Sequence, residues 1–509
     1  MAITSQPGAA TGSLPDPAPG GRLRLAALPH LPAESRPLVR PGEVSAGIVH
    51  LGLGAFHRAH QAVYTEAAIA LAGGDWGIVA VAPRSLDTVR QLSEQDNLFS
   101  VTTMSAEGTG TNVIGAFAGV RHAAGDPAAI VALLADPAIR VVTLTVTEKA
   151  YQLDPATGVL RPDPAVAADL TSDRPPVTVP GLLVRGLLAR ARAHAGPIAL
   201  VSCDNLPSNG RRLAGLVTQA LEYADAPAKA VDWVYANVTF PGTMVDRIVP
   251  ASTADTRAVA ERALGVADLM AVAGEPYRQW VIEDRFPGGR PAWERAGAVL
   301  TDDAGDWERL KLRTLNGLHS ATAYLGALAG RETIADALRI PHLSRVLRRL
   351  VAQDVANSFT PPDGVSVVAY GETVLERFAN PVICHRTVQV AMDGSQKLPQ
   401  RVLHTILDRR ALGARPRWAA LVVAAWMRFV QGRADDGSAL PLDDPLAPAI
   451  GAALAECDGT PAGVVTALLG LTEVFPPGLA DDDVVRELIV DWLTALDRHG
   501  VEATLAGAD

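Results

Sequence analysis

The stretch Gly47-Ile-Val-His-Leu-Gly-Leu-Gly-Ala-Phe-His57 carries the strongest indication of the fold. Its short apolar run before Gly52 predicts a buried strand. Residues 57–71 have the apolar spacing of a helix that ends at Gly73-Gly74, and residues 76–82 predict a second buried strand. Strand, helix and strand in this order indicate a βαβ unit with parallel strands.

The turn between the first strand and the helix has the features of a phosphate-binding loop. Gly52 permits a tight turn, Gly54 lets the backbone approach a pyrophosphate, and the helix that follows offers free N–H groups. We therefore assign Gly52, Gly54, Ala55 and Phe56 to cofactor binding. His57 stands where a third glycine is usual, so the fingerprint is incomplete, and Gly-x-Gly turns also occur without a cofactor.

The region after the second strand bears on the choice between NAD and NADP. It reads Ala82-Pro-Arg-Ser-Leu-Asp87, whereas an acidic residue at the strand end is usual for NAD. Arg84 would suit the 2′-phosphate of NADP, could stack on the adenine, or could be a solvated loop residue. Asp87 lies late in the chain for a ribose contact. We expect NAD, and NADP stays open.

The patterns divide the chain into three parts. Residues 1–40 predict a loosely ordered tail, and residues 41–295 continue the α/β pattern. From 296 to 505 the apolar residues follow helical spacing with few strand signals. We therefore expect a Rossmann-type α/β domain followed by a mainly α-helical C-terminal domain. Further expected elements are a hairpin from 98–103 and 111–115, strands at 140–147, 198–203 and 232–239, and helices near 127–135 and 180–195.

The composition is that of a globular protein with a large core. Of 509 residues 48% are apolar and 20% charged, which suggests two to four domains. A net charge of −10 argues against nucleic acid and an anionic membrane as partners. Three cysteines at these spacings match no disulfide framework and no metal site, which favours the cytoplasm. We find no secretory signal, and the apolar stretch 417–428 is too short to cross a bilayer.

Lysine is scarce in this chain. Of 45 basic residues only four are lysine: Lys149, Lys229, Lys311 and Lys397. Arginine evidently serves wherever a surface charge is enough. A retained lysine therefore has a raised chance of a role that needs release of its proton, which arginine essentially never allows.

Lys311 lies in a predicted helix together with Asn316 and His319. At about 100° per residue the three side chains fall within an arc of about 140°. One face then carries an amine, a carboxamide and an imidazole among leucines, and such groups need partners or a ligand. Each residue alone has an ordinary alternative, as an exposed charge, a packing amide or a core histidine.

Two further segments place polar residues beside buried strands. Asn205 follows the strand at 198–203, at the carboxyl end where α/β domains bind ligands, and its amide could donate to a substrate oxygen. The alternative is a turn-forming Asp-Asn pair before Pro207. Asp246 and Arg247, flanked by apolar residues, predict a partly buried ion pair that could be purely architectural.

Six segments together resemble the polyol-specific long-chain dehydrogenases, the mannitol dehydrogenase and fructuronate reductase family. Six motifs in one order along residues 45–410 are not expected by chance. The matching segments are Gly52-Leu-Gly-Ala-Phe-His-Arg-Ala-His-Gln61, Thr145-Val-Thr-Glu-Lys-Ala-Tyr151, Ser202-Cys-Asp-Asn-Leu-Pro207, Phe240–Pro250, Lys311-Leu-Arg-Thr-Leu-Asn-Gly-Leu-His319 and Asp393-Gly-Ser-Gln-Lys-Leu-Pro-Gln-Arg401.

The resemblance implies a reaction and the residues that perform it. It implies an active site between a Rossmann-type domain and a helical domain, where a nicotinamide cofactor and no metal interconvert a secondary alcohol and a ketone. By the family pattern Lys311 is the general base, and Asn205 and Asn316 hold the reacting oxygen. His319 orients the substrate.

Further binding residues follow from the same resemblance. Asp246 and Lys397 are expected at the substrate, and Glu148 at the cofactor. The runs 147–149, 385–389 and 393–401 look more like the fructuronate reductase branch, whose substrate carries a carboxylate. Lys149, Arg386 and Lys397 are then candidates to bind that carboxylate, although each could be an ordinary solvated charge.

The substrate is expected to be a small sugar acid or polyol. Ala150 and Val388 depart from the fructuronate reductase branch, which usually has glycine and often tryptophan there. We expect interconversion of D-mannonate and D-fructuronate by a monomer or small homo-oligomer. The alternatives are a mannitol 2-dehydrogenase or a D-arabinitol dehydrogenase. An alternative of another class is a non-catalytic nucleotide-binding protein, which would have no need of Lys311, Asn205 and Asn316 together.

Overall fold

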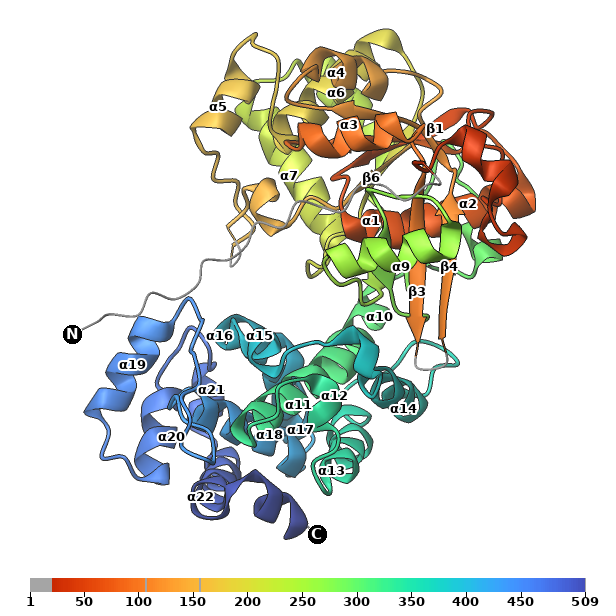
Figure 1. Ribbon diagram of the computed structural model, residues 1–509. Coiled ribbons are helices and arrows are strands. Elements are labelled where there is room, and N and C mark those ends of the chain that lie inside the picture. Colours follow the sequence, from red (N-terminus) through yellow and green to blue (C-terminus); the bar gives the residue numbers. More distant parts are fainter. Residues whose placement is uncertain (1–20, 106–107, 155–156, 509) are drawn as a thin grey trace, which may run out of the picture.

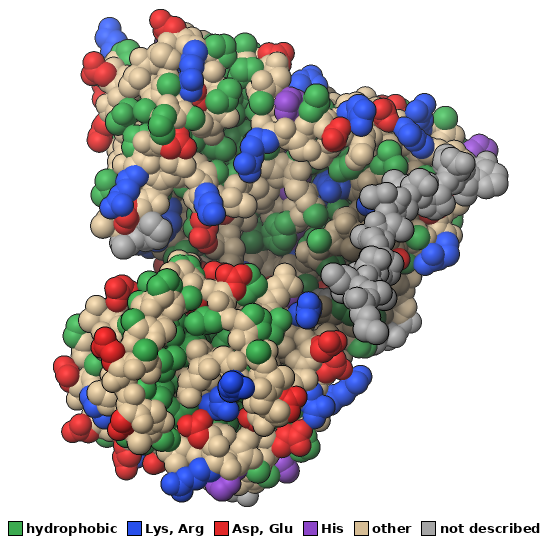
Figure 2. Space-filling model, turned by 60° about the vertical axis from the view of Figure 1, so that its left-hand side comes forward, with side chains coloured by type: hydrophobic (Ala, Val, Ile, Leu, Met, Phe, Trp, Pro, Cys, Tyr) green, Lys and Arg blue, Asp and Glu red, His purple; other side chains and the backbone are tan. Residues whose placement is uncertain are grey.

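The stretch before His57 forms the first strand of a parallel sheet, as expected. The computed structural model describes residues 21–105, 108–154 and 157–508. They form two lobes, one that contains the sheets, drawn in red to green, and a helical one, drawn in green to blue (Figure 1). A space-filling view shows a groove between the lobes (Figure 2). The predicted Rossmann-type domain followed by a helical domain is thus confirmed.

A six-stranded sheet is the centre of the first lobe. Its strand order is β5-β2-β1-β6-β7-β8, and every pairing in it is parallel. The order reverses direction between β1 and β6, and a parallel sheet binds its ligand beyond the carboxyl ends of the strands at such a point. The strands are β1 (Ala46–Leu51), β2 (Gly77–Ala82), β5 (Phe117–His122), β6 (Val141–Leu144), β7 (Ile198–Ser202) and β8 (Val238–Thr239).

Helices cover both faces of this sheet, which explains its continuous apolar strands. In β1, Ile48 points to one core cluster and Val49 to another, because successive side chains of a strand lie on opposite faces. The first face packs against α1 (Ala55–Ala59), α2 (Gln61–Ala72) and α3 (Leu86–Glu94). The second face packs against α4 (Pro127–Leu134), α5 (Pro164–Thr171), α6 (Val179–Ala193), α7 (Asn209–Tyr223) and α8 (Ala228–Asn237).

Two three-stranded sheets complete the first lobe. The predicted hairpin is present as the antiparallel pair β3 (Phe99–Ser105) and β4 (Gly108–Ile114), and β10 (Val272–Gly274) adds to β3 in parallel. The second sheet places β11 (Gln279–Glu283) between β9 (Thr243–Asp246) and β12 (Val299–Thr301). Because β12 pairs with β11, the sheet-containing lobe continues a few residues beyond 295. Helix α9 (Ala254–Leu264) packs against the hairpin.

The second lobe is helical and has one apolar core. Its central helix is α18 (Arg417–Phe429), which packs between α11 and α22. No helix among the described residues is long and apolar enough to cross a membrane. The other elements are α10 (Gly305–Leu310), η5 (Lys311–Asn316), α11 (Gly317–Leu328), α12 (Ile334–Ala337), α13 (Leu343–Arg349), η6 (Leu350–Val355), α14 (Val367–Phe378), α15 (Thr387–Ala391), α16 (Gly394–Leu398), η8 (Pro399–Leu403), α17 (His404–Ala411), α19 (Ala447–Glu456), α20 (Pro461–Leu469), α21 (Pro477–Ala480) and α22 (Asp483–Ala506).

One predicted strand is wrong. Residues 232–237 belong to helix α8, and only Val238 and Thr239 form a strand. The β-branched and aromatic residues in this run favour a strand, but the run begins inside a segment of good helix formers after Pro227. In the helix that forms, Val234 packs into the core whereas Tyr235 is 64% exposed.

The expectation of a loose tail is also wrong for residues 21–40, whereas residues 1–20 lie outside the described part. Leu23 and Leu31 are buried against Leu98 and Leu264, and a short 3₁₀-helix lies between them. The backbone N–H of Leu38 donates to the buried carboxylate of Glu66 at 2.7 Å. Segments distant in the sequence supply these contacts, so the composition of the tail did not reveal them.

Candidate active site

Lys311 lies where three elements from both lobes meet. Its Nζ atom donates to Oδ1 of Asn205, after β7, at 2.9 Å and to the backbone carbonyl of Val245, in β9, at 2.8 Å. Lys311 itself is the first residue of η5 in the helical lobe and is only 9% exposed. The structure therefore brings together Lys311 and Asn205, which the sequence singled out in separate segments.

The helix that carries Lys311 is a π-helix rather than an α-helix. The backbone N–H of Gly317 donates to the carbonyl of Leu312, five residues earlier, and the π-turn covers Lys311–Asn316. In a π-turn residues five apart lie above one another, so Lys311 and Asn316 share one face more closely than an α-helix allows. The Asn316 side chain is buried and makes no hydrogen bond with any residue that the structure describes.

Burial lowers the pKa of Lys311 below the usual value of a lysine. The carboxylate of Asp246 opposes this shift, whereas the nearby guanidinium groups of Arg401 and Arg377 add to it. A buried amine with cationic neighbours holds its proton less firmly. This is the property that a general base working near neutral pH requires.

Asp204 fixes the loop next to Asn205. Its carboxylate accepts the backbone N–H of Val146 at 3.2 Å and of Thr147 at 2.9 Å, and the Tyr151 hydroxyl donates to it at 2.8 Å. Burial raises the pKa of Asp204, while these donors counteract the rise. The carboxyl ends of β6 and β7 are therefore joined, and Asn205 follows directly from this junction.

The expected ion pair between Asp246 and Arg247 is wrong. Asp246 instead receives two hydrogen bonds from Arg377 of α14, at 2.7 and 2.9 Å, and Arg377 also binds Glu275 at 2.7 and 2.9 Å. The three side chains are at most 6% exposed. Adjacent residues of a strand point to opposite faces, so Asp246 and Arg247 cannot readily pair. Arg247 donates to the backbone of Glu275 and of Ala59.

Arg377 was not singled out from the sequence, although a signal existed. It lies on an amphipathic helix beside Val374, Leu375 and Phe378, all of which are buried. An arginine on the apolar face of a helix needs a buried partner. The sequence could not tell which carboxylates supply it, because they lie in the other lobe.

His319 lies one turn beyond Asn316 and contacts aromatic rings. Its ring centroid is 4.8 Å from that of Phe378 and 4.9 Å from that of His385. Lys397 lies in the same region, because its ammonium lowers the pKa of both His319 and His385. Lys397 donates to the carbonyls of Val390 and Met392 and is 3.6 Å from a carboxylate oxygen of Asp393.

Four other residues that the sequence analysis predicted for the site are exposed. Lys149 and Glu148 lie in the short helix after β6, Arg84 follows β2, and Arg386 precedes α15. Their side chains make no hydrogen bond or ion pair with the residues that the structure describes. Glu148 and Arg84 lie at the carboxyl ends of strands adjacent to β1, consistent with their assignment to a cofactor. Lys149 and Arg386 remain candidates for the substrate.

The loop after β1 fits a dinucleotide. Gly52 has φ +103°, and a Cβ atom there would lie 2.0 Å from the carbonyl oxygen of Thr145. Gly54 is exposed, and a Cβ atom there would meet only the Gly52 carbonyl, at 3.7 Å. The backbone N–H groups of Ala55 and Phe56 follow in the first helical turn, where they have no helical acceptor. An open glycine beside free N–H groups is the surface that a pyrophosphate needs.

His57 explains how this loop works without a third glycine. Its ring stacks on His50 of β1, with centroids 3.3 Å apart and planes 8° apart. The His57 side chain therefore packs against β1 of the sheet rather than pointing toward the phosphate site. Burial lowers the pKa of His50 to about 3, so this stack is uncharged at neutral pH. Two flat neutral rings allow close helix–strand contact, which is what a third glycine usually permits.

We expect the two glycines of this loop to respond differently to alanine. Gly52→Ala should destabilise the protein by about 1–3 kcal/mol, because φ and the Thr145 carbonyl both oppose a Cβ atom. Gly54→Ala should leave the melting temperature nearly unchanged but weaken NADH binding, because only the ligand would meet the new methyl group. Calorimetry and fluorescence titration with NADH measure both effects. Unimpaired NADH binding by Gly54→Ala would contradict the assignment of the loop.

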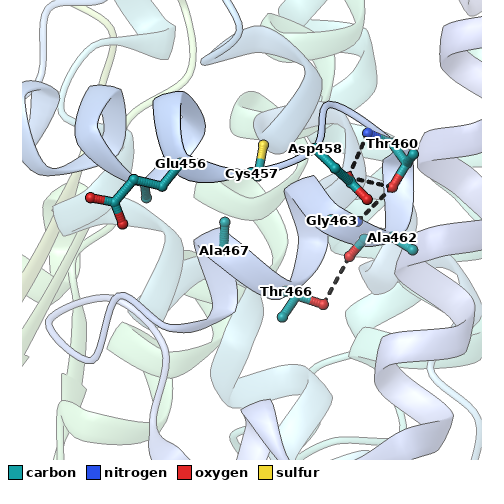
Figure 3. Close-up of a pocket in the computed structure, with 9 residues that line it drawn as sticks. Glu456, Cys457, Asp458, Thr460, Ala462, Gly463, Thr466 and Ala467 are labelled. Carbon is teal, nitrogen blue, oxygen red and sulfur yellow. Dashed lines mark hydrogen bonds between the residues drawn. The ribbon is translucent and has the colours of Figure 1, made fainter.

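A hollow of about 560 Å³ lies on the helical lobe between α19 and α20, away from all these residues. Its polar groups mostly bind one another. Oδ1 of Asp458 accepts the backbone N–H and the hydroxyl of Thr460, and Thr466 donates to the carbonyl of Ala462 (Figure 3). No group of three or more His, Cys, Asp or Glu side chains placed to hold a metal ion occurs in residues 21–105, 108–154 and 157–508.

Family models match both lobes. The model described as the mannitol dehydrogenase Rossmann domain matches residues 46–295, and that of the mannitol dehydrogenase C-terminal domain matches residues 303–497. The D-mannonate oxidoreductase of Escherichia coli is 41% identical over 92% of this chain and 98% of its own. The lobe that carries Gly52 and the lobe that carries Lys311 thus match the two parts of one family.

Two solved structures have the same fold over almost the whole chain. The mannitol 2-dehydrogenase of Pseudomonas fluorescens, in a ternary complex with NAD and D-mannitol, is 33% identical, covers 95% of this chain and 99% of its own, and has a TM-score of 0.81. A D-sorbitol dehydrogenase in substrate-free form is 31% identical, covers 95% and 100%, and has a TM-score of 0.88. The chain therefore belongs to the mannitol dehydrogenase family and is an oxidoreductase with a Rossmann-type cofactor domain.

Proposed function

We propose that this protein interconverts D-mannonate and D-fructuronate with NAD, using Lys311 as the acid/base group. The observation that carries the proposal is the position of the Lys311 amine, held between Asn205 and the Val245 carbonyl at the junction of the two lobes. When bound, NAD would supply the hydride acceptor for the carbinol carbon, and NADH the hydride donor for the ketone carbon. The chain must therefore supply proton transfer and hold the reacting oxygen.

The two hydrogen bonds of Lys311 suit proton transfer. A neutral amine has two N–H groups and one lone pair, and both N–H groups are engaged by the oxygens of Asn205 and Val245. The lone pair is then free to accept the hydroxyl proton of the alcohol. In the reductive direction the ammonium form returns that proton to the ketone oxygen. Burial, which lowers the pKa of Lys311, brings both forms within reach.

Two carboxamides can hold the reacting oxygen. Because Asn205 turns Oδ1 toward Lys311, its amide N–H groups are left for a ligand. The Asn316 amide lies on the same face of the π-turn as Lys311. Preorganised donors stabilise the negative charge that develops on the oxygen, and the loss of one such donor typically costs about 3–4 kcal/mol.

The cofactor is NAD. Support comes from the open loop at Gly54, the family match of the Rossmann lobe, and the related mannitol 2-dehydrogenase structure that contains NAD. Arg84 is exposed at the end of β2 and has no carboxylate partner among the described residues. A measurable reaction with NADPH is therefore compatible with this site, but NADH should be preferred.

A sugar acid is favoured over a neutral polyol by similarity and by charge. The E. coli D-mannonate oxidoreductase is more similar in sequence than the mannitol 2-dehydrogenase of known structure, at 41% against 33% identity. Lys397 and Arg401 also lie near His319. Cations next to a buried substrate site favour an anionic substrate. Mannitol 2-dehydrogenase activity is the second candidate, favoured by the structural likeness at TM-score 0.81.

We expect kcat/KM for NADH oxidation to be about 10- to 100-fold higher with D-fructuronate than with D-fructose. The reason is that a hydrogen bond to a charged group contributes about 1.5–3 kcal/mol, more than one to a hydroxyl. Initial rates followed at 340 nm, with each ketose and with NADH and NADPH, measure the preference. A higher kcat/KM with D-fructose would overturn the sugar-acid proposal and support the polyol alternative.

A further inference from the structure

The surroundings of His319 are cationic. Four groups act on its imidazole, namely His385, Arg401, Lys397 and Arg377, and each of them lowers the pKa of His319. Arg377 is fully paired with Asp246 and Glu275. For Lys397 the nearby carboxylate of Asp393 lies 3.6 Å away. Arg401 has no ion pair among the residues that the structure describes.

Two imidazole nitrogens in this region are buried without a partner. Nε2 of His319 and Nδ1 of His385 have no hydrogen-bond partner in the described part of the chain, although the two rings are only 4.9 Å apart. A buried polar atom that has no protein partner normally binds water or a ligand. The two atoms therefore mark a buried polar region of the helical lobe that the described residues leave unsatisfied.

Arg401 lies close to this unsatisfied polar region, because its charge acts on His319. It belongs to the π-helix η8, which packs against the π-helix η5 that carries Lys311. Its Nη1 atom donates to the hydroxyl of Ser320, next to His319, at 3.1 Å. Its charge also lowers the pKa of Lys311, so Arg401 lies near both Lys311 and Ser320. Its other guanidinium N–H groups donate to no acceptor among the residues that the structure describes.

We propose that Arg401, His319 and His385 form a receptor for the carboxylate of the substrate, and that Arg401 is the residue that discriminates sugar acids from neutral polyols. This inference rests on the proposed function, because it assigns the far end of the same substrate. A planar guanidinium fork matches a carboxylate with two parallel hydrogen bonds. A carboxylate also compensates the charge of the half-buried Arg401, which a hydroxyl group cannot do.

This assignment differs from the expectation drawn from the sequence. Lys397 is already satisfied by two carbonyls and by Asp393. Lys149 and Arg386 are exposed, and solvent screens an exposed charge. Arg401 is more buried than these two and forms no ion pair with the described residues, although the carboxylate of Asp393 acts on it from a longer distance. Of the cations that the structure describes near His319, it is therefore the one whose charge a substrate carboxylate would best compensate.

The test compares D-mannonate with D-mannitol, which differ at one terminal carbon. Binding of each to the NADH-loaded enzyme is measured by calorimetry, because this combination cannot react. We expect Arg401→Gln to raise the Kd of D-mannonate about 10- to 100-fold, corresponding to one charged hydrogen-bonding group. The Kd of D-mannitol should change by less than about 3-fold. Arg401→Lys, which keeps the charge but not the fork, should give an intermediate Kd for D-mannonate.

Arg415→Gln is the matched control. Arg415 is an exposed arginine of the same lobe that pairs with Glu487 at 2.8 Å, and its loss should leave both Kd values unchanged. Melting temperatures of all variants show whether the fold is intact. If Arg401→Gln raises the Kd of both ligands equally, or of neither, the proposed carboxylate receptor is wrong.

Reaction rates with the two ketoses distinguish a wrong carboxylate receptor from a wrong proposed function. Rates of the wild-type enzyme with D-fructuronate and D-fructose test the function without reference to Arg401. A wild-type preference for D-fructuronate that Arg401→Gln retains would overturn the receptor and leave the function in place. A preference for D-fructose would overturn the function, and the Kd of D-mannonate would still show whether Arg401 binds a carboxylate.

Discussion

Lys311→Ala is expected to lower kcat for alcohol oxidation by about 10²- to 10⁴-fold, the usual contribution of a positioned acid/base group. The amine is buried, bonded to Asn205 and Val245, and is the proton acceptor that the reaction needs. NADH binding should persist, because Gly52 and Gly54 are in the other lobe. Stopped-flow rates and NADH fluorescence titration measure the two effects. Full turnover by Lys311→Ala would refute the assignment.

The pH dependence of the wild-type enzyme has a definite sign. Burial lowers the pKa of Lys311, so the neutral amine becomes available below the usual range of lysine. Rates of alcohol oxidation should rise with pH as the amine loses its proton, and rates of ketone reduction should rise as pH falls. Lys311→Ala should remove this dependence, and added primary amines should restore part of the oxidation rate.

Lys229→Ala is the control for the lysine experiment. Lys229 lies exposed on α8 and contacts none of the described site residues, and its loss should leave rates and pH profile unchanged. Lys311→Arg adds a second comparison, since arginine keeps the positive charge but cannot release its proton. Substantial oxidation by Lys311→Arg would show that charge rather than proton transfer is the contribution of Lys311.

Arg377→Met is expected to lower the free energy of unfolding by about 3–5 kcal/mol, as is typical when one partner of a buried ion pair is removed. Its guanidinium binds both Asp246 and Glu275, and the three side chains are almost completely buried. Without Arg377 two carboxylates would be left unpaired in a region of low dielectric constant. Because Arg377 is in the helical lobe and its partners in the other, docking of the lobes should weaken as well.

Urea denaturation followed by circular dichroism, together with scanning calorimetry, measures this loss. A triple variant, Arg377→Met with Asp246→Asn and Glu275→Gln, should recover part of the stability because it removes all three charges together. Arg410→Met, which breaks a pair with Asp482 whose side chains are 23% and 19% exposed, serves as the control and should cost clearly less than Arg377→Met. Equal losses for Arg377→Met and Arg410→Met would contradict the importance of the buried cluster.

The parallel sheet and the loop at Gly52 could be predicted from local sequence. A continuous apolar run and two glycines specify a buried strand and a turn through local sterics alone, so β1, β2 and the hairpin β3–β4 agree with expectation. The segment 232–239 could not be predicted in this way. Its residues favour a strand locally, whereas in the structure residues 228–237 form one helix that buries Val234 in the core.

In the active site, too, some features follow from local sequence and others only from tertiary packing. The scarcity of lysine and the grouping of Lys311, Asn316 and His319 in one helical segment were visible in the sequence, because they depend only on composition and spacing. The π-turn, the bond from Lys311 to Asn205 and the pairing of Asp246 with Arg377 were not visible. These features join residues about 100 positions or more apart or change the helical period. Only the docking of the two lobes, which buries these polar groups and so forces them to find partners, establishes them.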